Sequence, residues 1–461
     1  MRTALVVGAE PDPAELAEAV AKADRTLFYS FAVAHDLADE TGRLGELVDI
    51  SAELWDLDAT AWAWAGDFTE CLRSQDRWIA PDVLDVAQRR LHVDVFWRIA
   101  LARARAEAVR ARLDDGSEIR SVGVTDLERD ALLALSTHGA GTDSAMPAVP
   151  HDSPTADGEP EPWLRSAARA MTEAREMAKR TADLAAEHAP GAETPTVVAL
   201  AAVPIHIKLL ESPLRALQAR GWRCIVLEVF TRGDLSAQAA AVGASWLNIA
   251  PFLPECEYPW RSPVGGRRRA KLERIVRAWT RSSGLEAHEA TILSGLEAEL
   301  VHSQRFVRGY ETILRSIRPQ AVLSVSELYP GIEPVSAAGR RLGIPVVHVQ
   351  HGNIPEIARM SDFPYDAFCV FGEAYAETLE RLGTPRGRIR VTGSPHMDLM
   401  PSAAEEFADC VTRLRSGETI PESAFESVER RYAFGADGRA GERIADACEE
   451  LAATPRRPAR S

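Results

Sequence analysis

Lysine is nearly absent from this chain of 461 residues. Only Lys22, Lys179, Lys208 and Lys271 occur, so arginine carries almost all of the positive charge. The formal net charge is −15, which argues against general binding to nucleic acids or to anionic membranes. We therefore expect no nucleic-acid partner and at most a peripheral association with membranes.

Cysteines and long apolar runs are also scarce. The six cysteines form no Cys-x-x-Cys pair, which excludes a zinc spacing and a disulfide framework. Cys224 and Cys369 lie inside apolar strand patterns, which predicts buried thiols in a reducing compartment. No apolar run approaches the roughly 18 residues that span a bilayer, and the N-terminus resembles a first strand more than a signal peptide. These absences predict a cytoplasmic protein with no metal site and no bound cofactor.

Common phosphate-binding fingerprints are missing too. The segment at residues 6–11 lacks Gly-x-Gly-x-x-Gly, and no P-loop occurs. The run Arg267-Arg268-Arg269 follows two glycines, and we interpret it first as the solvated face of a helix. Trp62 and Trp64 alternate on a possible strand, where core packing explains them better than stacking on a sugar.

Two regions of strands and helices are separated by a polar segment. Residues 1–137 predict a smaller N-terminal α/β domain. Residues 138–162 are rich in Gly, Pro, Ser, Thr and acids and have no apolar periodicity, which predicts a disordered linker. Residues 163–193 then predict an amphipathic connecting helix.

A second α/β domain is expected over residues 194–399. Its apolar strand patterns alternate with helical ones, and they lie at 196–203, 223–230, 244–250, 321–326, 346–350, 367–371 and 388–393. Strands that alternate with helices imply a parallel sheet with right-handed crossovers. The expected fold class is therefore α/β, with a Rossmann-like doubly wound parallel sheet preceded by the smaller domain.

Polar and small residues follow several of these strands, where open parallel sheets bind their ligands. The candidate substrate-binding and catalytic residues at these strand ends are His206, Lys208, Glu327, His351, Gly352, Asn353, Glu373 and Ser394. Their clustering at one edge of the expected sheet indicates a ligand-binding site more strongly than any single residue does.

His351 and Glu327 are the candidate catalytic residues. A histidine on a glycine-flanked turn can act as a general base toward a hydroxyl or donate a hydrogen bond to a phosphate. Glu327 can orient an acceptor hydroxyl or act as the base itself. The alternatives are a histidine that caps a local carbonyl and an acid held by the dipole of the following helix.

A series of short motifs carries a family resemblance. In order they are Gly343-Ile344-Pro345, Gln350-His351-Gly352, Phe371-Gly372-Glu373, and Val391-Thr392-Gly393-Ser394-Pro395 with Asp398. The segment 321–398 resembles GT-B-type glycosyltransferases of surface and capsule polysaccharide synthesis, including CDP-glycerol glycerophosphotransferase-like and polysialyltransferase-like proteins. The non-hydrolysing UDP-sugar 2-epimerases share a similar layout and a Thr-Gly turn at the domain junction.

The resemblance implies two facing Rossmann-like domains, of which residues 194–399 are the N-terminal, acceptor-type half. It also places the histidine of the His-Gly turn, His351, in the cleft between them. Only 63 of the 461 residues follow Asp398, whereas a nucleotide-binding domain needs on the order of 100–150. We therefore expect residues 400–461 to be a truncated remnant of the donor domain that ends in a terminal helix.

Three functions remain open. The first is a glycosyltransferase-like enzyme that takes a sugar or polyol phosphate from a nucleotide-activated donor to a carbohydrate acceptor, impaired by the shortened donor domain. The second is a non-catalytic acceptor-binding or scaffold protein that pairs with an intact transferase or a second copy of itself. The third is an enzyme similar to the UDP-sugar 2-epimerases.

Overall fold

The computed structural model describes most of the two predicted α/β regions. The described residues are 3–8, 13–29, 46–48, 50, 54–76, 79–113, 118–122, 124–137, 179–180, 182–184, 186, 194–229, 234–254, 263–325, 331–352, 354, 360, 364–398 and 437–455. The predicted linker 138–162, Glu327 and Asn353 lie outside them. No helix among the described residues is long and apolar enough to cross a membrane.

The chain forms two compact units. The first comprises residues 1–78, 87–159 and 259–299, and the second comprises 79–86, 160–258 and 300–461. Residues 259–299 thus belong to the first unit, although they lie within the range 194–399 expected for the second α/β domain.

The first unit contains a parallel sheet of order β3-β2-β1-β4. Its strands are β1 (Thr3–Val7), β2 (Arg25–Phe28), β3 (Glu46–Leu47) and β4 (Glu118–Val122), with helix α1 (Pro13–Lys22) between the first two. The smaller N-terminal α/β domain predicted from the sequence is therefore present.

Helices make up the rest of the first unit. They are α3 (Leu54–Gln75), the end of α4 (Pro81–Leu91), the π-helical turn η2 (His92–Phe96), α5 (Trp97–Arg110), α6 (Asp126–Thr137), α10 (Pro263–Ser283), η5 (Glu286–His288) and the start of α11 (Glu289–Ile317). The rings of Phe68, Phe96 and Trp279 pack together with centroids 4.9 to 5.8 Å apart.

The strand expected around Trp62 and Trp64 is wrong, because both residues lie within α3. Ala61, Ala65, Phe68 and Leu72 are buried at helical spacing, and this period outweighs the two-residue alternation of the tryptophans. Trp62 contacts the ring of His92 edge-on at 5.3 Å, so packing accounts for it.

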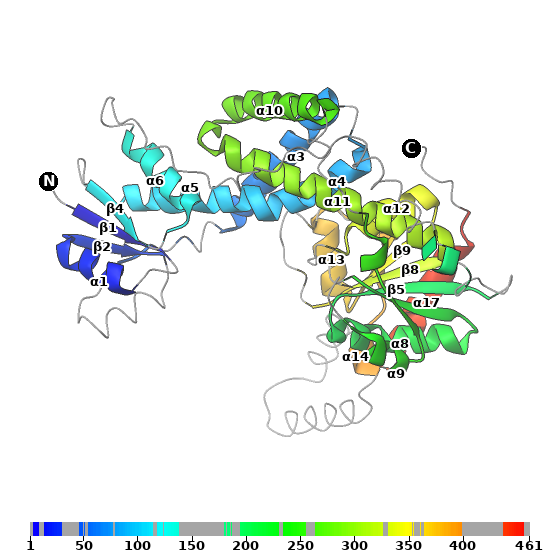
Figure 1. The fold of residues 1–461 in the computed structure, drawn as a ribbon. Helices are drawn as coiled ribbons and strands as arrows, with labels where there is room; N and C mark the ends of the chain where they lie inside the picture. The colour runs from blue at the N-terminus through cyan, green and yellow to red at the C-terminus, as the bar shows by residue number, and fades with distance from the viewer. Residues whose placement is uncertain are drawn as a thin grey trace, which may run out of the picture. The chain divides into compact units, whose positions relative to one another are not determined.

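The second unit is a doubly wound parallel sheet of seven strands, as the alternating pattern predicts (Figure 1). The strand order is β11-β10-β9-β8-β5-β6-β7. The strands are β5 (Thr196–Ala201), β6 (Arg223–Glu228), β7 (Ser245–Asn248), β8 (Ala321–Val325), β9 (Val346–Val349), β10 (Ala367–Val370) and β11 (Ile389–Val391).

Each face of this sheet has its own apolar core. One face is covered by α11, α12 (Pro334–Leu342) and α13 (Glu373–Arg381). The other face is covered by α8 (Pro204–Ala219), α9 (Ser236–Ala241) and the C-terminal helix α17 (Ala440–Ala453). The predicted burial of Cys224 and Cys369 is confirmed. α17 is the terminal helix that the sequence predicts, and its apolar residues pack with those of α8 in the core of this face.

Candidate functional site

The strand order reverses between β5 and β8. From β5 the chain winds outward through β6 and β7, and it then returns to β8 on the other side of β5 and winds outward through β9, β10 and β11. The helices that follow β5 and β8, α8 and α12, therefore pack on opposite faces of the sheet. Ligands of open α/β sheets bind in the crevice that this reversal creates at the carboxyl ends of the strands.

His206 is held firmly at this point. It lies in the first turn of α8, which starts immediately after β5 with Val203 extended and Pro204 at the first helical position. The side chain is fully buried, and its Nδ1 accepts the backbone N–H of Ala202 at 3.1 Å. In the neutral ring the proton is therefore on Nε2.

Burial keeps His206 neutral. Desolvation is the main cause, and His351 and His348 add smaller contributions, which together lower the pKa of His206 to about 4. Near neutral pH the His206 ring is therefore uncharged and fixed in place, and it can donate a hydrogen bond through Nε2.

His351 meets His206 at the carboxyl edge of the sheet. The two ring centroids are 5.3 Å apart and the rings are nearly perpendicular, at 80°. His351 itself is exposed on the turn after β9. Because β8 lies between β5 and β9 in the sheet, the two histidines flank the end of β8, at the reversal. This exposed imidazole can accept a proton from a hydroxyl or donate a hydrogen bond to a phosphate oxygen.

Gln350 shapes the turn that carries His351. Its side chain is 1% exposed, its amide nitrogen donates to the Gly352 carbonyl at 2.6 Å, and its amide oxygen accepts the Phe371 N–H at 2.7 Å. The side chain therefore ties the end of β9 to the end of β10. In the sequence Gln350 stands out only as a member of the Gln350-His351-Gly352 motif, and its place directly before a His-Gly turn is the signal from which this role could have been predicted.

A second buried histidine lies beneath the turn. His348 of β9 stacks on Tyr365 with centroids 4.7 Å apart, and its Nδ1 lies 3.4 Å from the Ser324 hydroxyl oxygen. It is fully buried, so it belongs to the core that supports the edge.

The other predicted site residues differ in their surroundings. Lys208 is exposed on α8, two residues after His206. Gly352 is also exposed, and a Cβ added there would meet no atom within 4 Å, so a ligand can approach its backbone closely. Glu373 begins α13, and its carboxylate pairs with Arg386 at 3.1 Å, so part of its charge is already compensated.

Ser394 follows β11 on a turn of defined shape. Gly393 before it has φ +85°, a left-handed conformation that favours glycine. The buried Thr392 donates its N–H to the Val370 carbonyl at 2.9 Å. Ser394 is half-buried and accepts the Met397 N–H through its carbonyl at 3.0 Å, at the start of the short helix α14 (Pro395–Asp398).

The topology therefore brings His206 and His351 into contact, and it sets Gly352, Glu373 and Ser394 at the carboxyl ends of neighbouring strands. Among the described residues no group of three or more His, Cys, Asp or Glu side chains is placed to hold a metal ion.

No protein-family model and no curated protein sequence matches the chain. Similar solved structures include UDP-GlcNAc 2-epimerase from Neisseria meningitidis bound to UDP-GlcNAc, with 13% identity, TM-score 0.30 and coverage of 48% of this chain and 52% of that one. A putative UDP-N-acetylglucosamine 2-epimerase from Listeria monocytogenes has 13% identity, TM-score 0.28 and coverage of 44% and 46%. The UDP-GlcNAc 2-epimerase of Methanocaldococcus jannaschii in complex with UDP-GlcNAc and UDP has 14% identity, TM-score 0.29 and coverage of 44% and 48%. The chain spans about half the length of these proteins.

Proposed function

We propose that the carboxyl edge of the seven-stranded sheet binds a nucleotide-activated sugar or polyol phosphate, and that the protein transfers this group to a carbohydrate hydroxyl. The observation that carries the proposal is the contact of exposed His351 with buried His206 at the reversal of strand order. A fixed neutral histidine beside an exposed one is suited to holding a reactive imidazole in one orientation. The motif series around His351 supports the same chemistry.

The proposed reaction is a displacement with His351 as general base. His351 takes the proton of the acceptor hydroxyl while the hydroxyl oxygen bonds to the anomeric carbon of the sugar, or to the phosphorus of a polyol phosphate. The bond to the nucleotide breaks at the same time, and the leaving phosphate oxygen keeps the electron pair. His206 is a positioning residue in this scheme, because it acts through the ring of His351.

The remaining residues have supporting roles in the proposal. Lys208 supplies a cation for the phosphate groups, and Gly352 lets the substrate approach the turn. Glu373 and Ser394 contact substrate hydroxyls, and Glu327 and Asn353, which follow β8 and β9 in the sequence, complete the contacts to the acceptor.

Calorimetric titration tests the proposal. The full chain is titrated with UDP-GlcNAc, with CDP-glycerol and with UDP, and we expect a dissociation constant below 1 mM for at least one of them. His351→Ala should weaken that binding about tenfold or more, whereas Arg315→Ala should leave it unchanged, because exposed Arg315 lies at the end of α11 that leads into the start of β8. An absence of heat with all three ligands contradicts the proposal and favours a scaffold role.

A second candidate is epimerisation of the sugar on its nucleotide. The observation that favours it is the turn at Thr392-Gly393, with buried Thr392 and left-handed Gly393, which is similar to the Thr-Gly turn of the UDP-sugar 2-epimerases. Incubation with UDP-GlcNAc alone, followed by proton NMR, separates the two reactions. Epimerisation converts the sugar at C2 without an acceptor, whereas transfer requires an acceptor and releases the nucleotide.

A further inference from the structure

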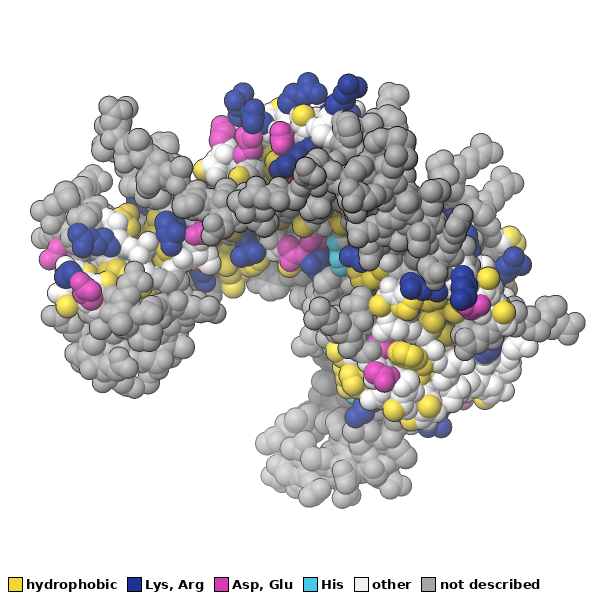
Figure 2. All heavy atoms as spheres, in the orientation of Figure 1, with side chains coloured by type: hydrophobic (Ala, Val, Ile, Leu, Met, Phe, Trp, Pro, Cys, Tyr) yellow, Lys and Arg dark blue, Asp and Glu magenta, His cyan; other side chains and the backbone are white. Residues whose placement is uncertain are grey.

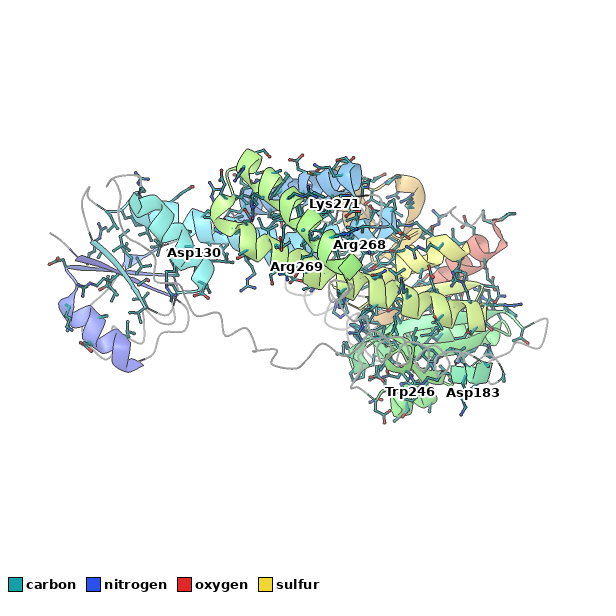
Figure 3. All side chains as sticks on the ribbon, turned by 45° about the horizontal axis from the view of Figure 1, so that its top comes forward. Asp130, Asp183, Trp246, Arg268, Arg269 and Lys271 are labelled. Atoms are coloured by element: carbon teal, nitrogen blue, oxygen red, sulfur yellow. The ribbon has the colours of Figure 1, made fainter. Side chains whose placement is uncertain are left out.

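Helix α10 of the first unit is strongly basic, although the chain as a whole is acidic. It carries seven arginines and lysines and a single acid, Glu273, in 21 residues, whereas the chain has 53 basic and 68 acidic residues. Dark-blue side chains gather over this helix in Figure 2. Figure 3 shows Arg268, Arg269 and Lys271 projecting from its first half.

The charge is organised by the period of the helix. Leu272, Ile275, Val276 and Trp279 are buried and face the core of the first unit. On the opposite side lie exposed arginines whose successive spacings are seven, three and four residues, and these spacings place them on one face of the helix. We call this row the arginine stripe, and it consists of Arg267, Arg274, Arg277 and Arg281.

Most of the stripe is not neutralised by neighbouring acids. Arg277 pairs with Glu289 at 3.0 Å. Among the described residues Arg267, Arg274 and Arg281 form no ion pair, and the Nε of Arg274 donates only to the Ala270 carbonyl at 3.3 Å. The acids of α10 and its neighbours instead pair with residues beside the stripe, as Glu273 and Glu297 do with Arg269 and Asp76 does with Lys271.

The shape of the stripe matches a planar partner. On the face of the helix that carries the stripe, the exposed Ala270 and Ala278 lie beside the arginines, so no bulky side chain of these two positions separates the charges. From Arg267 to Arg281 the helix rises about 21 Å at about 1.5 Å per residue. A flat anionic surface can meet all four guanidinium groups at once.

The chemistry of the stripe favours a lipid surface over a nucleic acid. Single-stranded nucleic acids are bound by basic grooves with exposed aromatic rings, and the one aromatic residue of α10, Trp279, is buried. The stripe also has no large apolar residue that could insert between acyl chains. At physiological salt, charges more than about 8 Å apart are largely screened, so the acids far from α10 do not cancel the local attraction.

We propose that the arginine stripe docks the protein on a bilayer that carries anionic phospholipid headgroups. The interaction is electrostatic and lies on the surface, without insertion into the hydrocarbon. It does not depend on the reaction proposed for the second unit. The sequence predicts at most a peripheral association with membranes, and this proposal assigns that association to α10.

Vesicle flotation with the full chain tests this inference. We expect binding to vesicles of 30% phosphatidylglycerol and 70% phosphatidylcholine at 0.1 M salt, loss of binding at 0.5 M salt, and no binding to pure phosphatidylcholine. Because each basic residue near an anionic surface contributes roughly fivefold, Arg267→Gln, Arg274→Gln and Arg281→Gln together should weaken binding about a hundredfold.

A matched control changes the net charge equally at other exposed arginines. Arg129→Gln, Arg215→Gln and Arg439→Gln together should leave vesicle binding within about twofold of the wild type. Circular dichroism checks that both triple variants remain folded. The inference is overturned if the wild type ignores phosphatidylglycerol, if both triple variants lose binding equally, or if a 30-nucleotide oligonucleotide binds more tightly than the vesicles.

Discussion

The carboxylate of Asp398 caps the C-terminal helix through the backbone of Gly441. One carboxylate oxygen accepts the Gly441 N–H at 2.7 Å and the hydroxyl of Ser212, and the other oxygen accepts the Ala440 N–H at 3.1 Å. The residue before the helix, Arg439, supplies no side-chain cap of its own. A side chain from α14 therefore satisfies the first N–H groups of α17 and links them to α8.

Asp398→Ala should loosen α17. The substitution leaves two helix N–H groups and the Ser212 hydroxyl without their acceptor, and the expected cost is about 2 kcal/mol. Hydrogen exchange followed by mass spectrometry should show a fall of roughly thirtyfold in protection over residues 440–453. Asp234→Ala removes a local cap from α9, where Ser236 N donates to the carboxylate at 3.0 Å, and it should leave α17 unchanged. Unaltered protection of α17 in Asp398→Ala would show that the cap contributes little.

Gly441→Ala should also destabilise the second unit. An added Cβ would lie 2.6 Å from the Ser212 carbonyl carbon and 2.8 Å from the Pro213 nitrogen, and these backbone atoms cannot move aside cheaply. We expect a loss of about 2 kcal/mol or more in urea unfolding, against the gain of up to about 1 kcal/mol from helix propensity. Gly266→Ala in α10 has no atom within 4 Å of its added Cβ and should be neutral or stabilising. Equal stability of the two variants would contradict the close approach of α17 to α8.

Much of the second unit follows from local patterns. Every strand predicted between residues 196 and 393 is present, because continuous apolar runs bounded by turn residues have few alternatives in a buried parallel sheet. Which side chains stabilise the carboxyl edge of the sheet depends on tertiary contacts, and local patterns could not predict these contacts. The alternation of strands and helices does not tell which side of β5 receives β8, so it could not bring His206 to His351.

Two features that the sequence analysis misjudged or missed, at Trp62 and Asp398, have related causes. The Trp62-x-Trp64 alternation suggested a strand because two residues cannot distinguish a period of 2 from a period of 3.6, whereas the buried alanines of α3 do. Asp398 was recognised only as the end of a motif. Its partner is in a helix 42 residues later, and neither composition nor periodicity records a cap supplied across such a distance.

His206 should make the stability of the second unit depend on pH. Its folded pKa of about 4 lies below the unfolded value of 6.5, so the unfolded chain binds more protons between these values. Stability is therefore retained above pH 6.5 and falls as the pH drops toward 4, by about 2 to 3 kcal/mol. Urea unfolding from pH 4 to 7 should show this loss in the wild type and not in His206→Gln, relative to their values at pH 7. Parallel curves would mean that His206 is not held neutral by burial.

Gln350→Ala should disorder the turn that presents His351 more than it weakens the sheet. The variant leaves the Phe371 N–H and the Gly352 carbonyl without their partner, so the ends of β9 and β10 separate. We expect faster hydrogen exchange at residues 350–352 and about tenfold weaker binding of whichever nucleotide ligand the wild type binds. Gln350→Glu should behave similarly, because a carboxylate cannot donate to the Gly352 carbonyl.

The matched control for Gln350→Ala is Gln320→Ala. It removes a side-chain acceptor of the Thr196 N–H at the start of β5, the end of that strand opposite the site. This control should lower the free energy of unfolding without changing ligand binding. If both glutamine sites affect binding equally, Gln350 acts through general stability and has no particular effect on the orientation of His351.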